Sequence, residues 1–323
     1  MVNHQFKGLT IALCLCACLS CAQKETVPSN PWLDAVSFHD DHKLTALTDL
    51  RELQRAVLQF LAEPDNTERL LTVQDAWRNA HTAYLEVKLL MHPHMNAVDA
   101  WPIEPGFLDV LPTYPESGII SDFSLEITSL ELRHQHQFTD PTESALGFHV
   151  IEYLIFSRPS ADFLISEDLK IDRRRQMLKL VTTLLLEDLS LTLAEPVVSP
   201  ASTDEQLHQL VTLLEQGTSH LYGESLQLVG DSHSKFSGQS RKNLLTQIRI
   251  VEKLIFNPVN LGSKLVLVNA MLARDITHTV REIVALLESE QSDAAIAETC
   301  SQLLNGLGHQ LRSFTSLLTP GIN

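Results

Sequence analysis

The chain has 323 residues of which 44% are hydrophobic, enough for a substantial core, and its length favours two domains over one. Its 12 glycines and 6% aromatic residues suit packed helices better than strands and tight turns. The formal net charge of -16 repels phosphate backbones and argues against nucleic acid as a partner.

The chain begins with a targeting segment. A continuous apolar run from Gly8 to Leu19 is too short to cross a bilayer, which needs about 20 residues, and is typical of a signal peptide. The chain turns polar directly after Cys21, and this pattern resembles a bacterial lipoprotein signal covering residues 1–20. We predict acylation at Cys21, with Cys18 as the alternative; an ordinary cleaved signal peptide stays open. The prediction implies export and a membrane anchor. Neither cysteine is followed by Asp, which by resemblance to known lipoprotein sorting rules implies the periplasmic face of the outer membrane.

Residues 21–42 contain two prolines and are predicted to form a tether. Residues 43–195 are predicted to form an N-terminal helical bundle. Apolar residues recur at three- and four-residue spacing from Leu47 to Leu61, and a second helix follows from Thr67. Five prolines between residues 92 and 118 predict a packed loop. Further helices are expected over about 122–132, from Asp140 to about 156, and over 169–195.

Prolines at positions 196 and 200 mark the clearest boundary, and residues 196–323 are predicted to form a C-terminal four-helix bundle. Its helices are expected at roughly 203–228, 239–256, 261–289 and 293–318. Cys300 lies on the apolar side of the last stretch and is expected to be a small core residue. The predicted fold is therefore all-α, with two packed helical-bundle domains behind the lipoprotein signal peptide.

His149 and Glu152 stand three residues apart in a predicted helix, so both side chains project from one face and can bind one metal ion. Gly147 is costly inside a helix by about 0.5–1 kcal/mol, which suggests that another part of the molecule approaches it closely. A buried His–Glu pair without a metal explains the same spacing. The pair supplies only two ligands and completes no zinc hydrolase motif.

Four stretches of the sequence resemble the imelysin-like family. They are residues 147–156, with the signature Gly147-x-His149-x-x-Glu152; residues 76–84, with Trp77; residues 98–109, with Trp101; and Phe236-Ser237 with the helix that follows. The resemblance implies two helical bundles in the cell envelope. The family was named for insulin-cleaving peptidases, and many relatives are associated with iron uptake.

The resemblance also implies a metal site. His149 and Glu152 are expected to be ligands, with Glu86 and Asp99 as further candidates, while Gly147, Trp77 and Trp101 support the motif. The expected ion is divalent or ferric, with iron favoured over zinc, and iron-transport components are the expected partners. Where the family pattern leads us to expect an acidic residue, this chain has Lys88. A cation there opposes a bound metal.

Three functions follow as hypotheses. The first is an envelope lipoprotein that binds a metal, with iron favoured, or serves iron uptake. The second is a metallopeptidase of the insulin-cleaving type, in which Glu152 acts as the base. The third is a metal-free helical scaffold for interactions, which Lys88 motivates. The sequence leaves enzymatic activity undecided and favours binding.

Overall fold

The structure is a computed structural model that describes residues 30–90, 97–109, 114, 117–230 and 232–318. Within these ranges its helices and short helical turns confirm the predicted helical class. The α-helices are α1 (Pro31–Ala62), α2 (Thr67–Lys88), α3 (Pro105–Leu108), α4 (Ser129–Gln135), α5 (Phe148–Phe156), α6 (Leu169–Ala194), α7 (Thr203–Leu226), α8 (Ser240–Ile255), α9 (Leu261–Val268), α10 (Ala270–Glu288) and α11 (Asp293–Leu318). The predicted signal peptide, with Cys18 and Cys21, lies outside the described residues. None of the described helices is long and apolar enough to cross a membrane.

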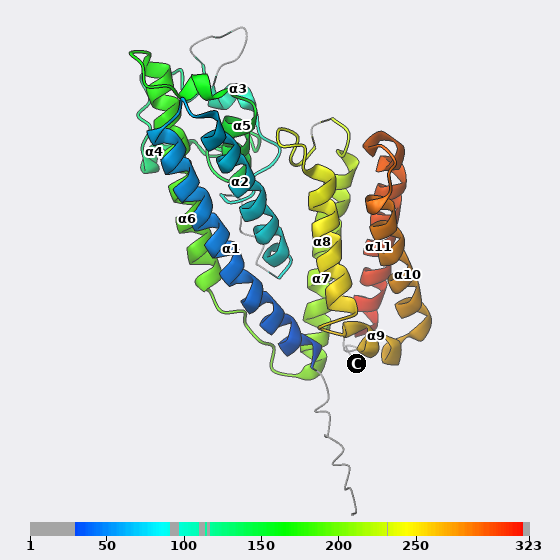
Figure 1. Ribbon diagram of the computed structural model, residues 1–323. Coiled ribbons are helices and arrows are strands. Elements are labelled where there is room, and N and C mark those ends of the chain that lie inside the picture. The colour runs from blue at the N-terminus through cyan, green and yellow to red at the C-terminus, as the bar shows by residue number, and fades with distance from the viewer. Residues whose placement is uncertain (1–29, 91–96, 110–113, 115–116, 231, 319–323) are drawn as a thin grey trace, which may run out of the picture.

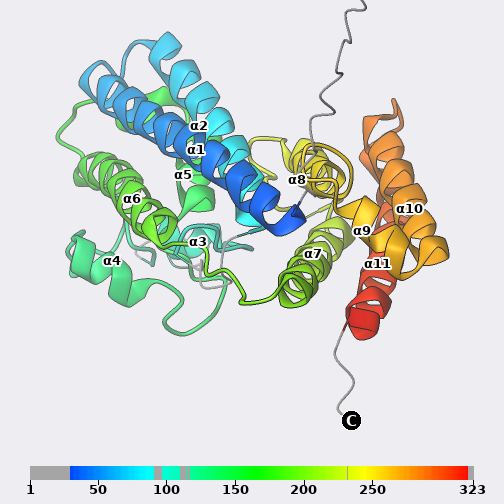
Figure 2. The same ribbon diagram turned by 90° about the horizontal axis from the view of Figure 1, so that it is seen from below.

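The helices form two groups that stand side by side (Figure 1). One group contains α1, α2, α5 and α6, and the other contains α7, α8, α10 and α11. Buried hydrophobic side chains form one cluster from residues 46–193 and a second mainly from residues 210–314. The groups touch where α1 meets α7 and where α2 meets α8 (Figure 2). The domain limit at residues 195 and 196 stays a prediction.

Helix α1 begins earlier than predicted and contributes buried side chains to both hydrophobic clusters. The tether predicted for residues 21–42 is wrong from Pro31 onward, because Pro31 is the first residue of the helix. The side chain of Asn30 accepts a hydrogen bond from the backbone N–H of Trp32 and caps this end. Proline is tolerated in a first helical turn, where its missing N–H is not needed. The first turns of α1 place Trp32, Ala35 and Phe38 in the second cluster.

Three other predicted helix boundaries need correction. The helix expected over 122–132 forms only as α4, and the stretch expected over 261–289 is divided into α9 and α10 at Asn269. The helix expected from Asp140 begins at Phe148. The Asp140 carboxylate accepts hydrogen bonds from the backbone and hydroxyl of Thr142 and forms a local turn instead. Helices α7, α8 and α11 lie where predicted, and Cys300 is buried in the second cluster.

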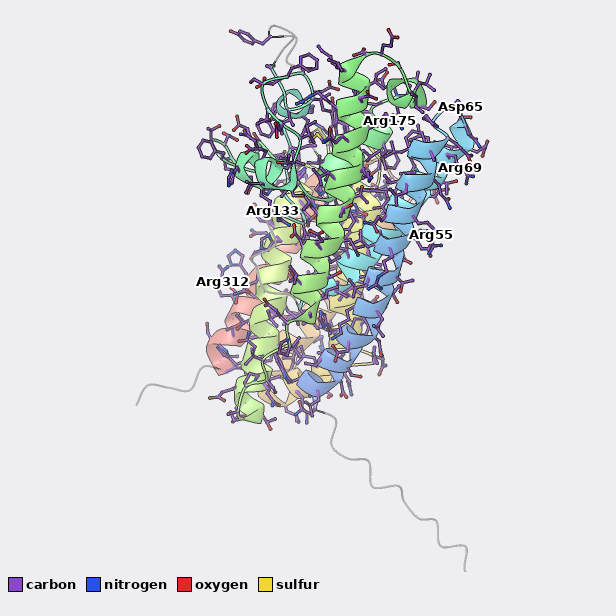
Figure 3. All side chains as sticks on the ribbon, turned by 90° about the vertical axis from the view of Figure 1, so that its left-hand side faces the viewer. Arg55, Asp65, Arg69, Arg133, Arg175 and Arg312 are labelled. Carbon is purple, nitrogen blue, oxygen red and sulfur yellow. The ribbon has the colours of Figure 1, made fainter. Side chains whose placement is uncertain are left out.

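Arg55, Arg133 and other labelled charged side chains lie at the outer surface of the helices (Figure 3). Arg133 on α4 pairs with Asp188 on α6 at 2.6 Å, and Arg55 on α1 pairs with Glu52 at 2.8 Å. These exposed pairs contribute little to stability, since solvent screens them. The buried polar groups between the two helix groups are a different case.

Candidate metal centre

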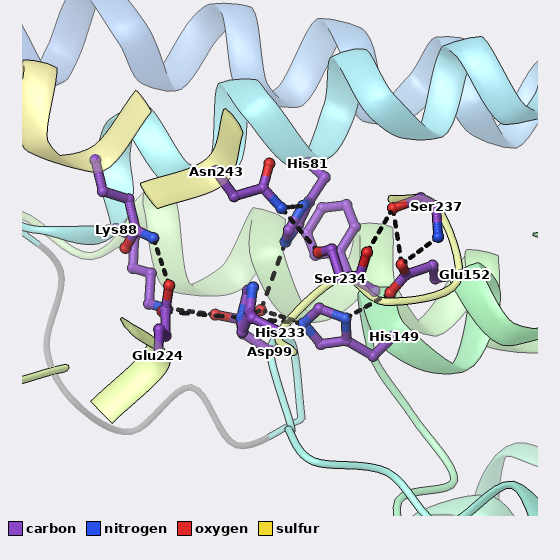
Figure 4. Close-up of polar contacts among 12 residues, drawn as sticks. His81, Lys88, Asp99, His149, Glu152, Glu224, His233, Ser234, Ser237 and Asn243 are labelled. Atoms are coloured by element: carbon purple, nitrogen blue, oxygen red, sulfur yellow. Dashed lines mark hydrogen bonds and ion pairs between the residues drawn. The ribbon is translucent and has the colours of Figure 1, made fainter. Parts of the chain in front are cut away.

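Three histidines and one aspartate meet where the two helix groups face each other. His81 comes from α2, Asp99 from the segment after α2, His149 from α5, and His233 from the segment between α7 and α8. One ligand atom from each residue lies within 4.8 Å of all the others, and Figure 4 shows the side chains converging. Both helix groups therefore contribute to one cluster.

The spacing of the ligand atoms suits a metal ion. Oδ1 of Asp99 lies 3.1 Å from Nε2 of His149, 3.4 Å from Nε2 of His233 and 3.7 Å from Nε2 of His81. The Nε2 atoms of His149 and His233 are 3.2 Å apart. Four ligands at about 2.1 Å from a tetrahedrally coordinated ion lie about 3.4 Å from one another. These four distances, from 3.1 to 3.7 Å, scatter around that separation, and every pair of ligand atoms lies within 4.8 Å.

Glu152 lies beside the cluster and contacts it through His149. Its Oε2 is 2.9 Å from Nδ1 of His149, while its Oε1 accepts hydrogen bonds from the backbone N–H and the hydroxyl of Ser237 at 2.9 and 2.8 Å. A carboxylate at Nδ1 fixes the ring orientation and leaves Nε2 to face a metal, as the outer partners of metal-binding histidines commonly do. Ser237 therefore positions Glu152, and the N-cap of α8 is Gln239.

Gly147 brings the Asp99 segment against the start of α5. It has a φ of +100°, and a Cβ atom built there would lie 2.7 Å from the carbonyl oxygen of Val98. The same oxygen accepts a hydrogen bond of 2.8 Å from the backbone N–H of Phe148. Because Val98 directly precedes Asp99, this contact places the Asp99 carboxylate beside His149. The close approach that the glycine suggested is therefore made by a loop.

Lys88 pairs with the oxygen of Asp99 that faces away from the histidines. Its Nζ lies 2.6 Å from Oδ2 of Asp99 and 3.3 Å from Oε1 of Glu224, while Gln247 donates a hydrogen bond of 2.9 Å to Oε2 of Glu224. With neutral histidines, Asp99, Glu152, Glu224 and Lys88 sum to a net charge of -2, and the proton that His149 carries in the metal-free protein reduces it to -1. Burying negative charge is costly and favours a bound cation.

Burial and the neighbouring carboxylates have opposite effects on the pKa values of the histidines in the site. Burial alone lowers the pKa of His149, but the hydrogen bonds and charges of Asp99 and Glu152 outweigh it and raise that pKa to about 9. Burial lowers the pKa of His81 to about 4. Burial raises the pKa of Asp99, yet Lys88 and the histidines hold it well below its usual range. Without a metal, a proton on Nε2 of His149 therefore faces Asp99 at neutral pH.

The hydrogen bonding of the cluster is consistent with a missing partner. Nε2 of His81 is buried, has no hydrogen-bond partner among the described residues, and faces Oδ1 of Asp99 at 3.7 Å. The amide of Asn243 lies 3.3 Å from the other ring nitrogen of His81 and donates to Oγ of Ser234 at 2.8 Å. A metal bound by Nε2 would satisfy the buried nitrogen, so the residues present fit the ion.

The other predicted residues lie around the cluster. Trp77 is fully buried, stacks on His81 at 4.8 Å and donates from Nε1 to the carbonyl oxygen of Phe148. Trp101 meets the His233 ring at 5.5 Å. Glu86 is half-buried on α2 and does not belong to the cluster of ligand atoms. Sequence reasoning missed His233 and Glu224, since neither lies in a motif. It also did not name His81 as a ligand, although His81 lies within the stretch 76–84.

A cleft of about 620 Å³ borders the cluster at Asp99 and His233. Its lining includes Lys88, Asp99, Trp101, Glu224 and His233. An all-helical fold with a buried centre of three histidines and one aspartate defines the class: a helical protein whose site can hold a metal ion.

Comparison with known proteins assigns the chain within that class. The model of the imelysin family, described as peptidase M75, matches residues 42–289, and the chain belongs to this family. An imelysin-like protein from Psychrobacter arcticum 273-4 has a similar solved structure, with a TM-score of 0.57 and 16% sequence identity over 89% of this chain and 92% of that one. At that identity the likeness concerns the fold. A comparison with curated proteins finds no match.

Proposed function

We propose that the chain binds a metal ion at His81, Asp99, His149 and His233 and serves metal handling in the cell envelope, with iron as the ion. The observation that carries the proposal is the convergence of four ligand atoms on one buried point. Imidazole and carboxylate ligands suit iron and zinc alike. Iron is favoured by the family resemblance, and zinc remains the alternative ion.

The proposal differs from the ligand set expected from sequence. His149 and Asp99 belong to the cluster, while Glu152 supports His149 and Glu86 lies outside. Lys88, which counted against a metal, lies behind Asp99 and leaves Oδ1 facing the histidines. The lysine therefore balances the charge of Asp99 and Glu224 without occupying the centre of the cluster.

The second candidate, a metallopeptidase, is favoured by the family's description. A peptidase at this site needs a carboxylate free to accept a proton from water. Both oxygens of Glu152 already have partners, and so do both oxygens of Asp99 and of Glu224. Glu152 is also only 1% exposed. The geometry therefore supports binding better than catalysis.

Elemental analysis of the purified protein tests the proposal. Wild-type chain should hold about one equivalent of iron or zinc after loading and dialysis, and His149→Ala should lose it. His134→Ala serves as a matched control, since His134 is exposed on α4. Equal, near-zero metal in all three proteins leaves the scaffold hypothesis. Cleavage of an unfolded protein by metal-loaded wild type, absent in Glu152→Gln, would instead favour the peptidase.

The envelope location rests on the amino-terminal sequence. We infer lipid anchoring at Cys21, or at Cys18, on the periplasmic face of the outer membrane, with iron-transport components as partners. Palmitate labelling should be lost in one of Cys21→Ala and Cys18→Ala. A wild-type chain that takes up no palmitate would leave the ordinary cleaved signal peptide, and labelling that persists in both variants would show that neither cysteine is the acylation site.

A further inference from the structure

Helix α9 and the first residues of α10 carry exposed apolar side chains close together. Four of them, which we call the apolar corner, lie within a short stretch: Val266, Leu267, Val268 and Met271. Leu267 is 81% exposed and Met271 is 75% exposed. The inner side of α9 is apolar as well, since Leu261 and Leu265 are buried in the second hydrophobic cluster. A helix at the surface of a soluble protein normally has a polar outer face, and exposed apolar groups mark contact sites for proteins or membranes.

The apolar corner lies at the end of the molecule where α1 begins. Trp32, in the first turn of α1, shares the second hydrophobic cluster with Leu261. Nζ of Lys253, in the last turn of α8, lies 5.7 Å from the centre of the Phe38 ring on α1. Figure 1 shows α9 near the start of α1, and Figure 2 shows the same end from below. The other end of α1 is about 48 Å away, since each residue of a helix adds about 1.5 Å.

The predicted lipid anchor joins the molecule at this same end. Nine peptide units connect Cys21 to Asn30, which caps α1, and they span at most about 30 Å. Acylation at Cys18 would add three residues to this reach. An anchor at either cysteine therefore holds the start of α1, and the apolar corner beside it, closer to the bilayer than the far end of α1.

The residues around the apolar corner are basic, although the protein is acidic. Residues 253–274 contain Lys253, Lys264 and Arg274 but no aspartate or glutamate, whereas the whole chain has a net charge of -16. Anionic lipid headgroups attract lysine and arginine. A stable protein interface buries about 800 Å² on each partner, which is more than four side chains provide. A lipid surface needs no such area, because a lipid anchor and a weak second contact act together.

We propose that the apolar corner inserts into the headgroup region of the membrane that holds the lipid anchor, with Lys264 and Arg274 against anionic headgroups. The proposal rests on the lipid anchoring inferred above. It leaves the candidate metal centre outside the lipid, because His233 precedes α8 and the corner follows the other end of that helix, about 24 Å away. The anchor and the corner together would fix which end of the protein faces the membrane.

Tryptophan fluorescence in vesicles tests the proposal. The full-length exported chain is reconstituted into vesicles of phosphatidylethanolamine and phosphatidylglycerol, with and without brominated acyl chains. The emission that Leu267→Trp adds to wild type should shift to shorter wavelength and be quenched by the bromine. Ile165→Trp is the matched control, since Ile165 is 74% exposed and precedes α6, whose Arg175 donates to the Leu61 carbonyl at the far end of α1. Its emission should be neither shifted nor quenched.

Palmitate labelling of the same samples reports the anchor separately. A labelled chain whose Leu267→Trp emission is unquenched overturns the membrane contact and keeps the anchor. Quenching in a chain without label supports the contact and removes the anchor. A chain with neither label nor quenching has lost both.

Two further measurements separate lipid from protein as the occupant of the apolar corner. Replacing phosphatidylglycerol with phosphatidylcholine should reduce the quenching, and equal quenching in both mixtures would remove the role of Lys264 and Arg274. Leu267→Gln should leave the urea midpoint of unfolding unchanged, because the side chain is exposed. Sedimentation without lipid should give the same mass for wild type and Leu267→Gln. A wild-type dimer that this variant dissociates would show that a second copy covers the corner, and it would overturn the proposal.

Discussion

Replacing Gly147 with alanine should damage both the fold and the metal site. The residue has a φ of +100°, a conformation that costs a non-glycine residue about 1–3 kcal/mol. The new Cβ would lie 2.7 Å from the carbonyl oxygen of Val98, where ordinary contacts begin at 3.4 Å, so the Asp99 segment must move by about 0.7 Å. Overpacking typically costs about 1–3 kcal/mol more, so together these effects should lower the free energy of unfolding by about 2–6 kcal/mol.

Urea unfolding of the metal-free protein measures this loss of stability. Calorimetric titration measures the affinity for zinc, which should fall because Asp99 is displaced. Gly306→Ala is the control: Gly306 lies inside α11, and a Cβ there meets nothing within 4 Å. The same substitution should stabilise the protein at that position by about 0.5–1 kcal/mol. If Gly147→Ala is as stable as wild type and binds zinc equally well, the close approach of Val98 does not position Asp99.

Three further predictions concern the charges of the site. Glu152→Gln should weaken zinc binding about 10- to 100-fold without abolishing it, because Glu152 orients His149 and is not itself a ligand; calorimetry measures the change. Lys88→Met should leave the buried carboxylates of Asp99 and Glu224 without the cation that balances them, so differential scanning calorimetry should show a lower melting temperature without metal and a larger rise with zinc. The pKa of His149 is raised to about 9 from 6.5, so its charged form stabilises the metal-free protein fully below pH 6.5, and that contribution is lost as the pH rises through 9. Zinc binding at pH 7 should therefore release about one proton, measurable in buffers of different ionisation enthalpy.

The sequence predicted the helical class and the long helices well, because apolar spacing records which face each helix buries. Helices α7, α8 and α11 follow such stripes. The prediction of helix boundaries was wrong where one residue type is compatible with two local structures. Pro31 opens α1 although it suggested a tether, and Asp140 forms a turn although it suggested a helix cap.

The candidate site could be predicted only in part, because its residues are distant in sequence. His149 and Glu152 share a helix and could be paired by spacing alone. His233 lies 84 residues after His149, and nothing local distinguishes it from a solvated histidine. Whether Lys88 opposes a bound metal depends on which oxygen of Asp99 it contacts. Only the three-dimensional packing determines that contact.

Helix α1 has a consequence for how this protein can be shortened. The stretch matched by the family model begins at residue 42, whereas the helix begins at Pro31. A chain cut at the family boundary would lose Trp32, Ala35 and Phe38, and with them part of the apolar surface that the α7–α11 helices bury. Such a fragment would expose a hydrophobic surface and is expected to aggregate, even though it keeps every ligand of the metal centre. The functional unit therefore extends upstream of the part that identifies the family.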